Sequence, residues 1–140
     1  MGHYGGQFDR LIVWYNLPRF EREDRLLEAS DIAHKAVEAA TEKQATDIVL
    51  LDVRDICNFA DYFVLSTAES DRQINAVAEE IEKVLKAEGE RPIHREGSAD
   101  SGWVLLDYGD VIVHTFAPSE RDFYNLEELW SGAKTLVRIQ

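Results

Sequence analysis

GWVLLDYGDVIVH, residues 102–114, carries the clearest structural signal in this chain. Two apolar runs with alternating character flank the dipeptide Tyr108-Gly109. A glycine-containing dipeptide between two such runs is typical of a tight turn that joins antiparallel strands. We therefore predict a β-hairpin whose strands cover about residues 102–107 and 110–116.

Acidic and aromatic side chains gather around the turn of this hairpin. Asp107 and Asp110 bracket the turn, and Trp103 and Tyr108 lie close by in the sequence. A strand tryptophan usually fills a core, but tryptophan is also enriched among the residues that dominate binding at interfaces. The residues alone leave both roles of Trp103 open. The two carboxylates favour a recognition surface for a basic, partly apolar partner.

The other predicted elements lie on both sides of the hairpin. In chain order they are a helix over about 26–43, strands over 47–53 and 61–67, a helix that starts after Ser70 and stops at Gly89, a strand over 91–96, and a helix that opens at Pro118. This order, α-β-β-α-β-β-β-α, predicts an α/β (α+β) fold with a mixed five-stranded sheet flanked by helices. We place an amino-terminal extension at 1–29, one domain at 30–131 and a tail at 132–140, whose TLVRI segment is suited to strand pairing.

Local patterns predict how the helices begin and which sides they bury. Ser70 and Gln73 have the spacing of a capping box, in which the serine hydroxyl accepts a backbone N–H and the glutamine reaches back to the cap. The side chains of that helix expected to face the core are Ile74, Val77, Ile81, Val84 and Leu85. Ser30 is one candidate cap of the first helix, which could also begin near Glu23. The apolar stripe expected in the last helix is Phe123, Leu126 and Trp130, together with Leu129.

The net charge of the chain favours one class of binding partner over another. The chain has 27 acidic residues against 15 Lys and Arg, for a net charge of −12. Residues 1–25 sum to zero, so the whole excess lies in 26–140. Affinity for phosphate backbones comes from Lys and Arg, so this body disfavours direct contact with nucleic acid and favours a basic protein. Solubility alone also explains such a charge.

Length and cysteine use indicate the class of chain and its compartment. One hundred and forty residues fit one domain with its own core. No apolar run approaches the length of a membrane span, and the first residues lack the basic and apolar regions of a signal peptide. A single cysteine, Cys57, cannot form an internal disulfide. We therefore expect a protein of a reducing compartment such as the cytoplasm.

Catalytic and metal-binding patterns are sparse. The sequence contains no phosphate-binding loop, dinucleotide-binding glycine motif, HExxH, GxSxG or paired CxxC. Asp107 and Asp110 could hold Mg²⁺ across the turn, but accepting backbone N–H bonds is the favoured role of a turn aspartate. Cys57 is expected to fill a small buried space. His94 and His114 are expected to be structural, with His114 suited to pairing with a carboxylate.

Five separated motifs point to a known family. They are LLDVRD (50–55), DYFVL (61–65), SDR (70–72), WVLLDYGDVIVH (103–114) and ERDFYNLEELW (120–130). In this order they resemble the ribosomal silencing factor family, also called RsfS or Iojap-like. The resemblance runs from about Ser30 to Trp130, which is roughly three-quarters of the chain.

The resemblance implies a nucleotidyltransferase-like fold and a role without catalysis. Members of the family bind the large ribosomal subunit through its protein uL-fourteen and sterically block joining of the small subunit, which represses translation when nutrients are scarce. Organellar relatives assist large-subunit assembly. Carried onto this chain, the partner-binding residues are Trp103, Asp107, Tyr108 and Asp110, with Arg121 and Tyr124 on the following helix. We expect no cofactor and no metal, and the acidic charge of the body favours little direct contact with RNA.

Two features of the sequence leave alternatives open. The nucleotidyltransferase signature, a Gly-Ser turn followed by D-x-D, is absent, because Asp107 and Asp110 have the spacing D-x-x-D. An enzyme is therefore a weaker alternative than a large-subunit assembly factor. The sequence also allows a homodimer formed through the exposed hairpin or its neighbouring helix. The role of the first ~30 residues is open. We expect that changing Trp103 to Ala, or Asp107 to Lys, abolishes binding to the large subunit and leaves the fold intact.

Overall fold

The computed structural model describes residues 27–140. The helices are α2 (Ala29–Glu42), α3 (Asp71–Ala87), α4 (Pro118–Tyr124) and α5 (Leu126–Leu129). The strands are β1 (Thr46–Asp52), β2 (Tyr62–Thr67), β3 (His94–Ser98), β4 (Trp103–Asp107), β5 (Val111–Phe116) and β6 (Lys134–Ile139), with a short 3-10 turn, η2, at Ala99–Ser101. The predicted extension at 1–29 lies almost wholly outside the described residues.

One six-stranded sheet, in the order β3-β4-β5-β2-β1-β6, organises these elements. All neighbouring strands are antiparallel except β2 and β5, which run parallel, so the prediction of a mixed sheet is confirmed. The sixth strand is the tail: β6 pairs with β1 from Ile139 opposite Ile48 to Lys134 opposite Asp52. The domain therefore includes the segment that we placed outside it at 132–140.

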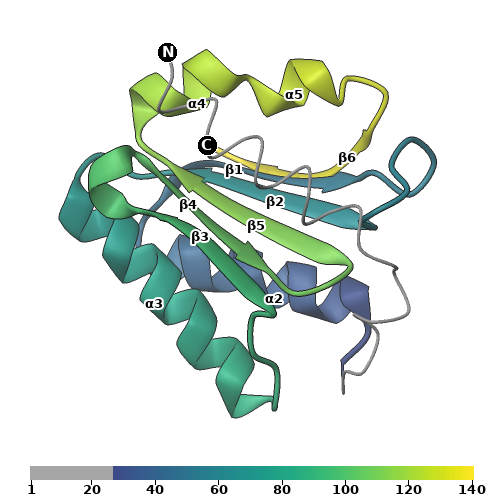
Figure 1. Ribbon diagram of the computed structural model, residues 1–140, viewed down its shortest axis with the longest axis horizontal. Coiled ribbons are helices and arrows are strands. Elements are labelled where there is room, and N and C mark those ends of the chain that lie inside the picture. The colour runs from purple at the N-terminus through teal and green to yellow at the C-terminus, as the bar shows by residue number, and fades with distance from the viewer. Residues whose placement is uncertain (1–26) are drawn as a thin grey trace.

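Helices pack on the two faces of the sheet, as Figure 1 shows: α2 and α3 lie below it, and α4 and α5 run above it. The first face, against α2 and α3, holds the larger apolar cluster, with Val64, Val104 and Val113 contributed by the strands. The second face holds a separate cluster that includes Phe63, Trp103 and Phe116. Because successive strand residues point to opposite faces, neighbouring positions such as Trp103 and Val104 belong to different clusters.

The predicted hairpin is confirmed as β4 and β5, paired from Trp103 opposite Phe116 to Asp107 opposite Ile112. Its loop contains three residues, 108–110, and not the two-residue turn that the sequence indicated. Gly109 has φ +94°, a left-handed conformation that a side chain would strain. A glycine in this conformation is typical of three-residue hairpin loops.

One of the two hydrogen bonds predicted for the cap of α3 is confirmed, and the other has a different partner. The Ser70 hydroxyl accepts the Gln73 N–H at 3.1 Å, as predicted. The Gln73 amide oxygen accepts the N–H of Glu69, one residue before the cap. The Gln73 amide nitrogen also donates to the carbonyls of Lys43 and Gln44, so this side chain fastens α3 to the end of α2.

Two other helix predictions are wrong in detail. Ser30 lies inside α2, whose cap is Glu28. The last helix is broken at Asn125, which adopts φ +43° and ψ +56° between α4 and α5. This left-handed residue interrupts the helical period, so the expected stripe is split. Leu126 is buried, whereas Phe123 is 52% exposed.

Candidate docking surface

The hairpin side chains that we expected at a surface are enclosed. Trp103 is 1% exposed, and its ring stacks on Phe116 with centroids 5.1 Å apart and lies 4.3 Å from the ring of Tyr124. Its indole N–H donates to Nδ1 of His114 at 3.1 Å. Of the two roles left open for Trp103, the structure supports the core role. The expectation that this ring is exposed is wrong.

His114 is a buried histidine held by the indole and not by the carboxylate we expected. Because Nδ1 accepts the Trp103 N–H, the neutral ring carries its proton on Nε2, which has no hydrogen-bond partner within the described residues. Burial, together with a smaller effect of the nearby charge of Arg121, lowers the pKa of His114 from 6.5 to about 3. The ring therefore stays neutral at physiological pH.

This depressed pKa predicts how stability depends on pH. As the pH falls below about 6.5, the unfolded chain takes up a proton at His114 that the folded chain does not bind, so folding becomes less favourable. We expect the free energy of unfolding to fall by up to about 1.4 kcal/mol per pH unit from this group between pH 6 and pH 4. Urea unfolding at each pH measures this slope.

His114→Asn is the informative variant, because its side-chain oxygen can still accept the indole N–H but does not titrate. It should show a shallower fall in stability with acid than the natural chain. Equal slopes for His114→Asn and the natural chain would contradict the assignment.

The two carboxylates at the hairpin turn, Asp107 and Asp110, are also buried. Asp107 is fully buried, and its Oδ1 accepts the Gly109 N–H at 2.7 Å, which confirms the turn-forming role. Asp110 is 8% exposed, and its carbonyl accepts the N–H groups of Asp61 and Tyr62 at 2.7 and 3.0 Å. Asp110 thereby joins the hairpin loop to the start of β2. The expectation that these two carboxylates form an exposed acidic surface at the hairpin turn is wrong, because the hydrogen bonds of the loop hold both residues in buried positions.

Tyr108 lies on the opposite side of the sheet from Trp103. It belongs to the cluster under α2 and α3, and it is 2% exposed. Burial raises the pKa of its hydroxyl, with a further contribution from the negative charge of Glu82. The residues carried over from the family pattern therefore do not converge on one surface.

Arg121 and Tyr124 fasten α4 to the second face. The Arg121 guanidinium donates to the Thr67 hydroxyl at 2.8 Å and to a carboxylate oxygen of Glu127 at 3.0 Å. Tyr124 is half-buried against Trp103. Both side chains position the helices α4 and α5, and their own contact with a partner stays a prediction.

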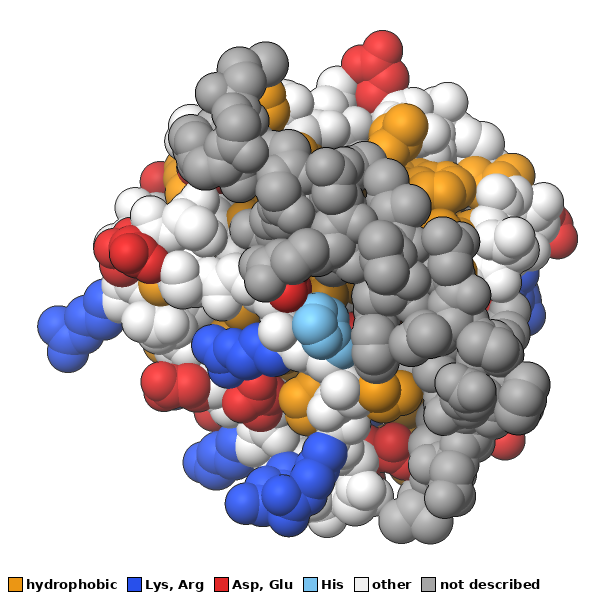
Figure 2. Space-filling model, in the orientation of Figure 1, with side chains coloured by type: hydrophobic (Ala, Val, Ile, Leu, Met, Phe, Trp, Pro, Cys, Tyr) orange, Lys and Arg blue, Asp and Glu red, His pale blue; other side chains and the backbone are white. Residues whose placement is uncertain are grey.

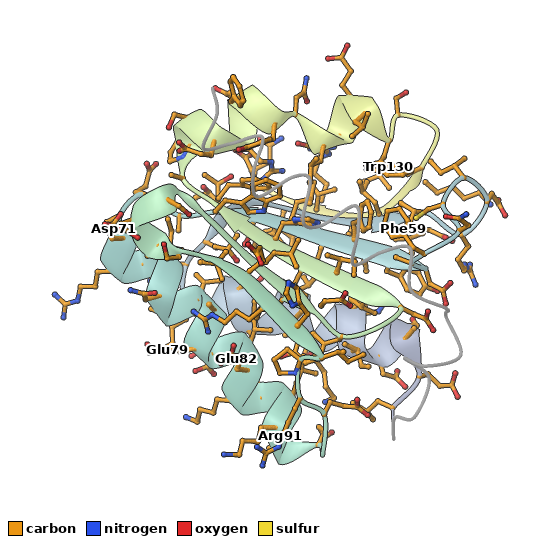
Figure 3. The ribbon with its side chains drawn as sticks, in the orientation of Figure 1. Phe59, Asp71, Glu79, Glu82, Arg91 and Trp130 are labelled. Atoms are coloured by element: carbon orange, nitrogen blue, oxygen red, sulfur yellow. The ribbon has the colours of Figure 1, made fainter. Side chains whose placement is uncertain are left out.

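Apolar side chains that the sequence analysis did not place at a surface are exposed at the other end of these helices. Ile56 is 41% exposed and Leu129 59% exposed. Figure 2 shows apolar side chains gathered at the upper right, over α5 and the loop between β1 and β2. We call Ile56, Phe59, Leu129 and Trp130 the α5 patch. Figure 3 shows Phe59 and Trp130 beside each other, and their rings meet edge to face at 5.8 Å.

A network of charges borders the α5 patch. Arg54 donates two hydrogen bonds to the Asp52 carboxylate, and these lower the pKa of Asp52. The guanidinium also lies 5.4 Å from the centre of the Tyr62 ring. A shallow open hollow beside Trp130 is lined by Arg54, Asp55, Ile56, Cys57 and Asn58. Cys57 itself is buried in the second-face cluster, as predicted.

The sequence carried a weak signal for this patch. The segment Arg54–Ala60 follows a buried strand and reads as a turn, yet it contains Ile56 and Phe59. Apolar residues in a turn are a reason to look for a second packing partner. Leu129 was assigned to the buried side of one continuous helix, and the break at Asn125 removed it from that side.

No group of three or more His, Cys, Asp or Glu residues suited to a metal ion occurs among residues 27–140. In the same part of the chain, no helix is both long and apolar enough to cross a membrane.

The fold and its two apolar clusters define a small α/β domain built around a mixed sheet. The family model described as "Ribosomal silencing factor during starvation" matches residues 27–140, which is every described residue. The chain belongs to the ribosomal silencing factor family, so the family resemblance is confirmed.

Individual relatives agree with this assignment. The ribosomal silencing factor of Bacillus subtilis is 43% identical over 98 residues, covering 70% of this chain and 83% of the relative. A crystal structure of a protein from Chromobacterium violaceum has a TM-score of 0.72 and 34% identity, covering 79% of this chain and 94% of that one. A mouse protein named for mitochondrial assembly of the large ribosomal subunit is 29% identical over 93 residues, covering 64% of this chain and 41% of the relative. The Bacillus subtilis and mouse relatives are named as a silencing factor and an assembly factor, and not as enzymes.

Proposed function

We propose that this protein is a ribosomal silencing factor that acts without catalysis. It binds the large ribosomal subunit in the cytoplasm through the ribosomal protein uL-fourteen and sterically prevents the small subunit from joining. The observation that carries this proposal is the family match over residues 27–140. The action needs no bond-making, only a stable footprint where the other subunit must fit.

The α5 patch is the accessible surface that best fits a protein partner. It combines exposed aliphatic groups, Ile56 and Leu129, with half-buried aromatic rings, a composition enriched at the centre of protein interfaces. Glu127 and Glu128 lie on the same short helix. Figure 3 also places the acidic side chains of Asp71, Glu79 and Glu82 on α3. A body with this charge is steered toward a basic protein such as one seated among ribosomal RNA phosphates.

The buried hairpin residues contribute to this surface indirectly, because they help to hold α4 and α5 in position. Trp103 packs against Tyr124, and Arg121 anchors the turn between α4 and α5 through Glu127. Changes at these residues would reach a partner by moving α4 and α5.

Binding to large subunits tests the surface directly. Leu129→Asp should weaken co-sedimentation of the full chain with purified large ribosomal subunits by tenfold or more, because a charge in the centre of an apolar contact must be desolvated. The matched control is Ile93→Asp, which makes the same kind of change at a residue that is 45% exposed and lies outside the patch.

The control should bind as the natural chain does, and both variants should unfold at similar urea concentrations. Equal binding by Leu129→Asp and the natural chain would remove the α5 patch from the proposal. Failure of the natural chain itself to co-sediment would remove the proposed function.

Assembly of the large subunit is a second candidate function, favoured by the similarity to the mouse mitochondrial assembly protein. The two functions differ in the particle that is bound. Profiling which particles accompany the protein in a lysate separates them, since an assembly factor should be enriched on immature large subunits.

A further inference from the structure

The shallow hollow beside Trp130 is built from two segments that are distant in the sequence. Trp130, which caps the end of α5, forms one side. Its ring packs edge to face on Phe59 and Phe63, with centroids 5.8 and 5.5 Å apart, and Figure 3 shows Phe59 beside it. The loop between β1 and β2 forms the other side, with Arg54, Asp55, Ile56, Cys57 and Asn58.

Internal contacts hold both sides of this hollow in place. The N–H groups of Ile56 and Cys57 both donate to the carbonyl of Val53, at 3.1 and 2.9 Å, which folds the loop into a tight turn. Ile56 also packs on the turn after α5, where a β-carbon added at Gly132 would lie 3.4 Å from one of its methyl groups. The hollow is therefore preformed, so that a partner side chain can enter without first ordering the loop.

Asp55 carries the accessible charge of the hollow. Its side chain is 83% exposed, and Nζ of Lys134 approaches one carboxylate oxygen at 3.7 Å from a side chain that is itself 71% exposed. An ion pair between two such exposed groups contributes little to stability. A cation from another molecule can therefore take the place of Lys134 at small cost.

Arg54 lines the same hollow, but its charge is already matched. Its guanidinium donates to both carboxylate oxygens of Asp52, at 3.0 and 2.7 Å, and lies 5.4 Å from the centre of the Tyr62 ring. A carboxylate that accepts two hydrogen bonds from one guanidinium is a strong and specific partner for it. An anion entering the hollow would have to displace Asp52, whereas a cation meets the exposed carboxylate of Asp55.

We propose that this hollow receives one long cationic side chain, a lysine or an arginine, from the protein partner. The aliphatic stem of that side chain lies along Trp130 and Ile56, and its charged end reaches the Asp55 carboxylate. Lysine and arginine commonly combine a stem packed on apolar groups with a charged end at the surface. The inference rests on the proposed function and extends it, because it names the chemistry that the α5 patch recognises.

The size and surroundings of the hollow suit this occupant. Its volume, about 690 Å³, gives room for one long side chain. Glu128 adds an exposed carboxylate on α5, and the net charge of the chain is −12. An approaching cation is attracted by this field, whereas an acidic side chain is repelled by it.

Reversing the charge at Asp55 tests the proposal in the full chain. Asp55→Lys places an ammonium group where the charged end of the partner side chain would lie, so affinity for purified large ribosomal subunits should fall by tenfold or more. Asp55→Asn removes the charge without reversing it and should give a smaller loss. Added salt should weaken binding of the natural chain more steeply than binding of Asp55→Asn, because salt screens the ion pair that the variant lacks. Co-sedimentation over a range of chain concentrations measures each affinity.

Glu38→Lys is the matched control, because it makes the same change in net charge at an exposed residue of α2, on the other face of the sheet. It should lower the affinity by less than threefold. All three variants should unfold at urea concentrations close to that of the natural chain, since both positions are exposed.

The outcomes separate this inference from the proposed function. Equal losses of affinity in Asp55→Lys and Glu38→Lys would overturn the inference, because only the net charge would then matter, and so would unchanged binding by Asp55→Lys. In both cases, binding by the natural chain leaves the proposed function in place. Failure of the natural chain to bind large subunits would remove the proposed function and the inference together.

Discussion

Changing Trp103 to Ala is expected to lower the free energy of unfolding by about 3–5 kcal/mol, the cost of truncating a buried aromatic side chain. The ring is 1% exposed and contacts Phe116, Tyr124 and His114. Alanine would leave a cavity in the second-face cluster and would leave Nδ1 of His114 without its donor. Urea unfolding followed by far-ultraviolet circular dichroism measures the loss independently of tryptophan fluorescence.

Leu129→Ala is the control, since a side chain that is 59% exposed should change stability by less than about 0.5 kcal/mol. A loss below about 1 kcal/mol for Trp103→Ala would contradict the core role of this residue. Our expectation from sequence, that this change leaves the fold intact, is replaced by the present one. A loss of partner binding in Trp103→Ala would then be uninformative about direct contact.

Changing Asp107 to Lys is expected to destabilise the fold by about 3 kcal/mol or more, or to prevent folding. The carboxylate is fully buried and accepts the Gly109 N–H. Lysine removes this acceptor and places an ammonium group where no water reaches, and a buried charge without a partner costs several kcal/mol. Thermal unfolding of the purified variant provides the measurement.

Asp107→Asn is the matched control, because its side-chain oxygen can still accept the Gly109 N–H. It should cost no more than about 1–2 kcal/mol, which is the typical value for weakening one charge-assisted hydrogen bond. Similar stability of Asp107→Lys and Asp107→Asn would show that the side chain at 107 reaches solvent.

Hydrophobic periodicity was sufficient to predict most of the architecture. The hairpin, the capped helix α3 and the mixed sheet all follow from short-range patterns in the sequence. Some element boundaries differ from the prediction. For example, β3 was expected over 91–96 and lies at His94–Ser98. The sixth strand depends on pairing with β1, a contact between segments that are distant in the sequence.

The exposure of the hairpin could not be deduced in the same way. WVLLD occupies an inner strand, flanked by β3 and β5, and a strand with both faces covered carries nearly continuous apolar residues. In the sequence, an acidic residue at each end of the loop is typical of a solvated turn. In the fold, the Asp107 carboxylate accepts a backbone N–H of the loop, and the Asp110 carbonyl accepts two N–H groups at the start of β2, so both residues are buried.

The α5 patch was missed for a related reason. Its members come from the loop between β1 and β2 and from the end of a broken helix, and no sequence spacing links them. Asn125 is a residue type that adopts left-handed conformations readily, which is the one local signal for the break.

The most direct test of the silencing account is a subunit-joining measurement. Purified large subunits are incubated with an excess of the full chain, small subunits are added, and formation of intact ribosomes is followed by light scattering. The account predicts that the chain lowers the fraction of joined subunits and that Leu129→Asp restores joining. Normal joining in the presence of natural chain that demonstrably co-sediments with the large subunit would contradict it.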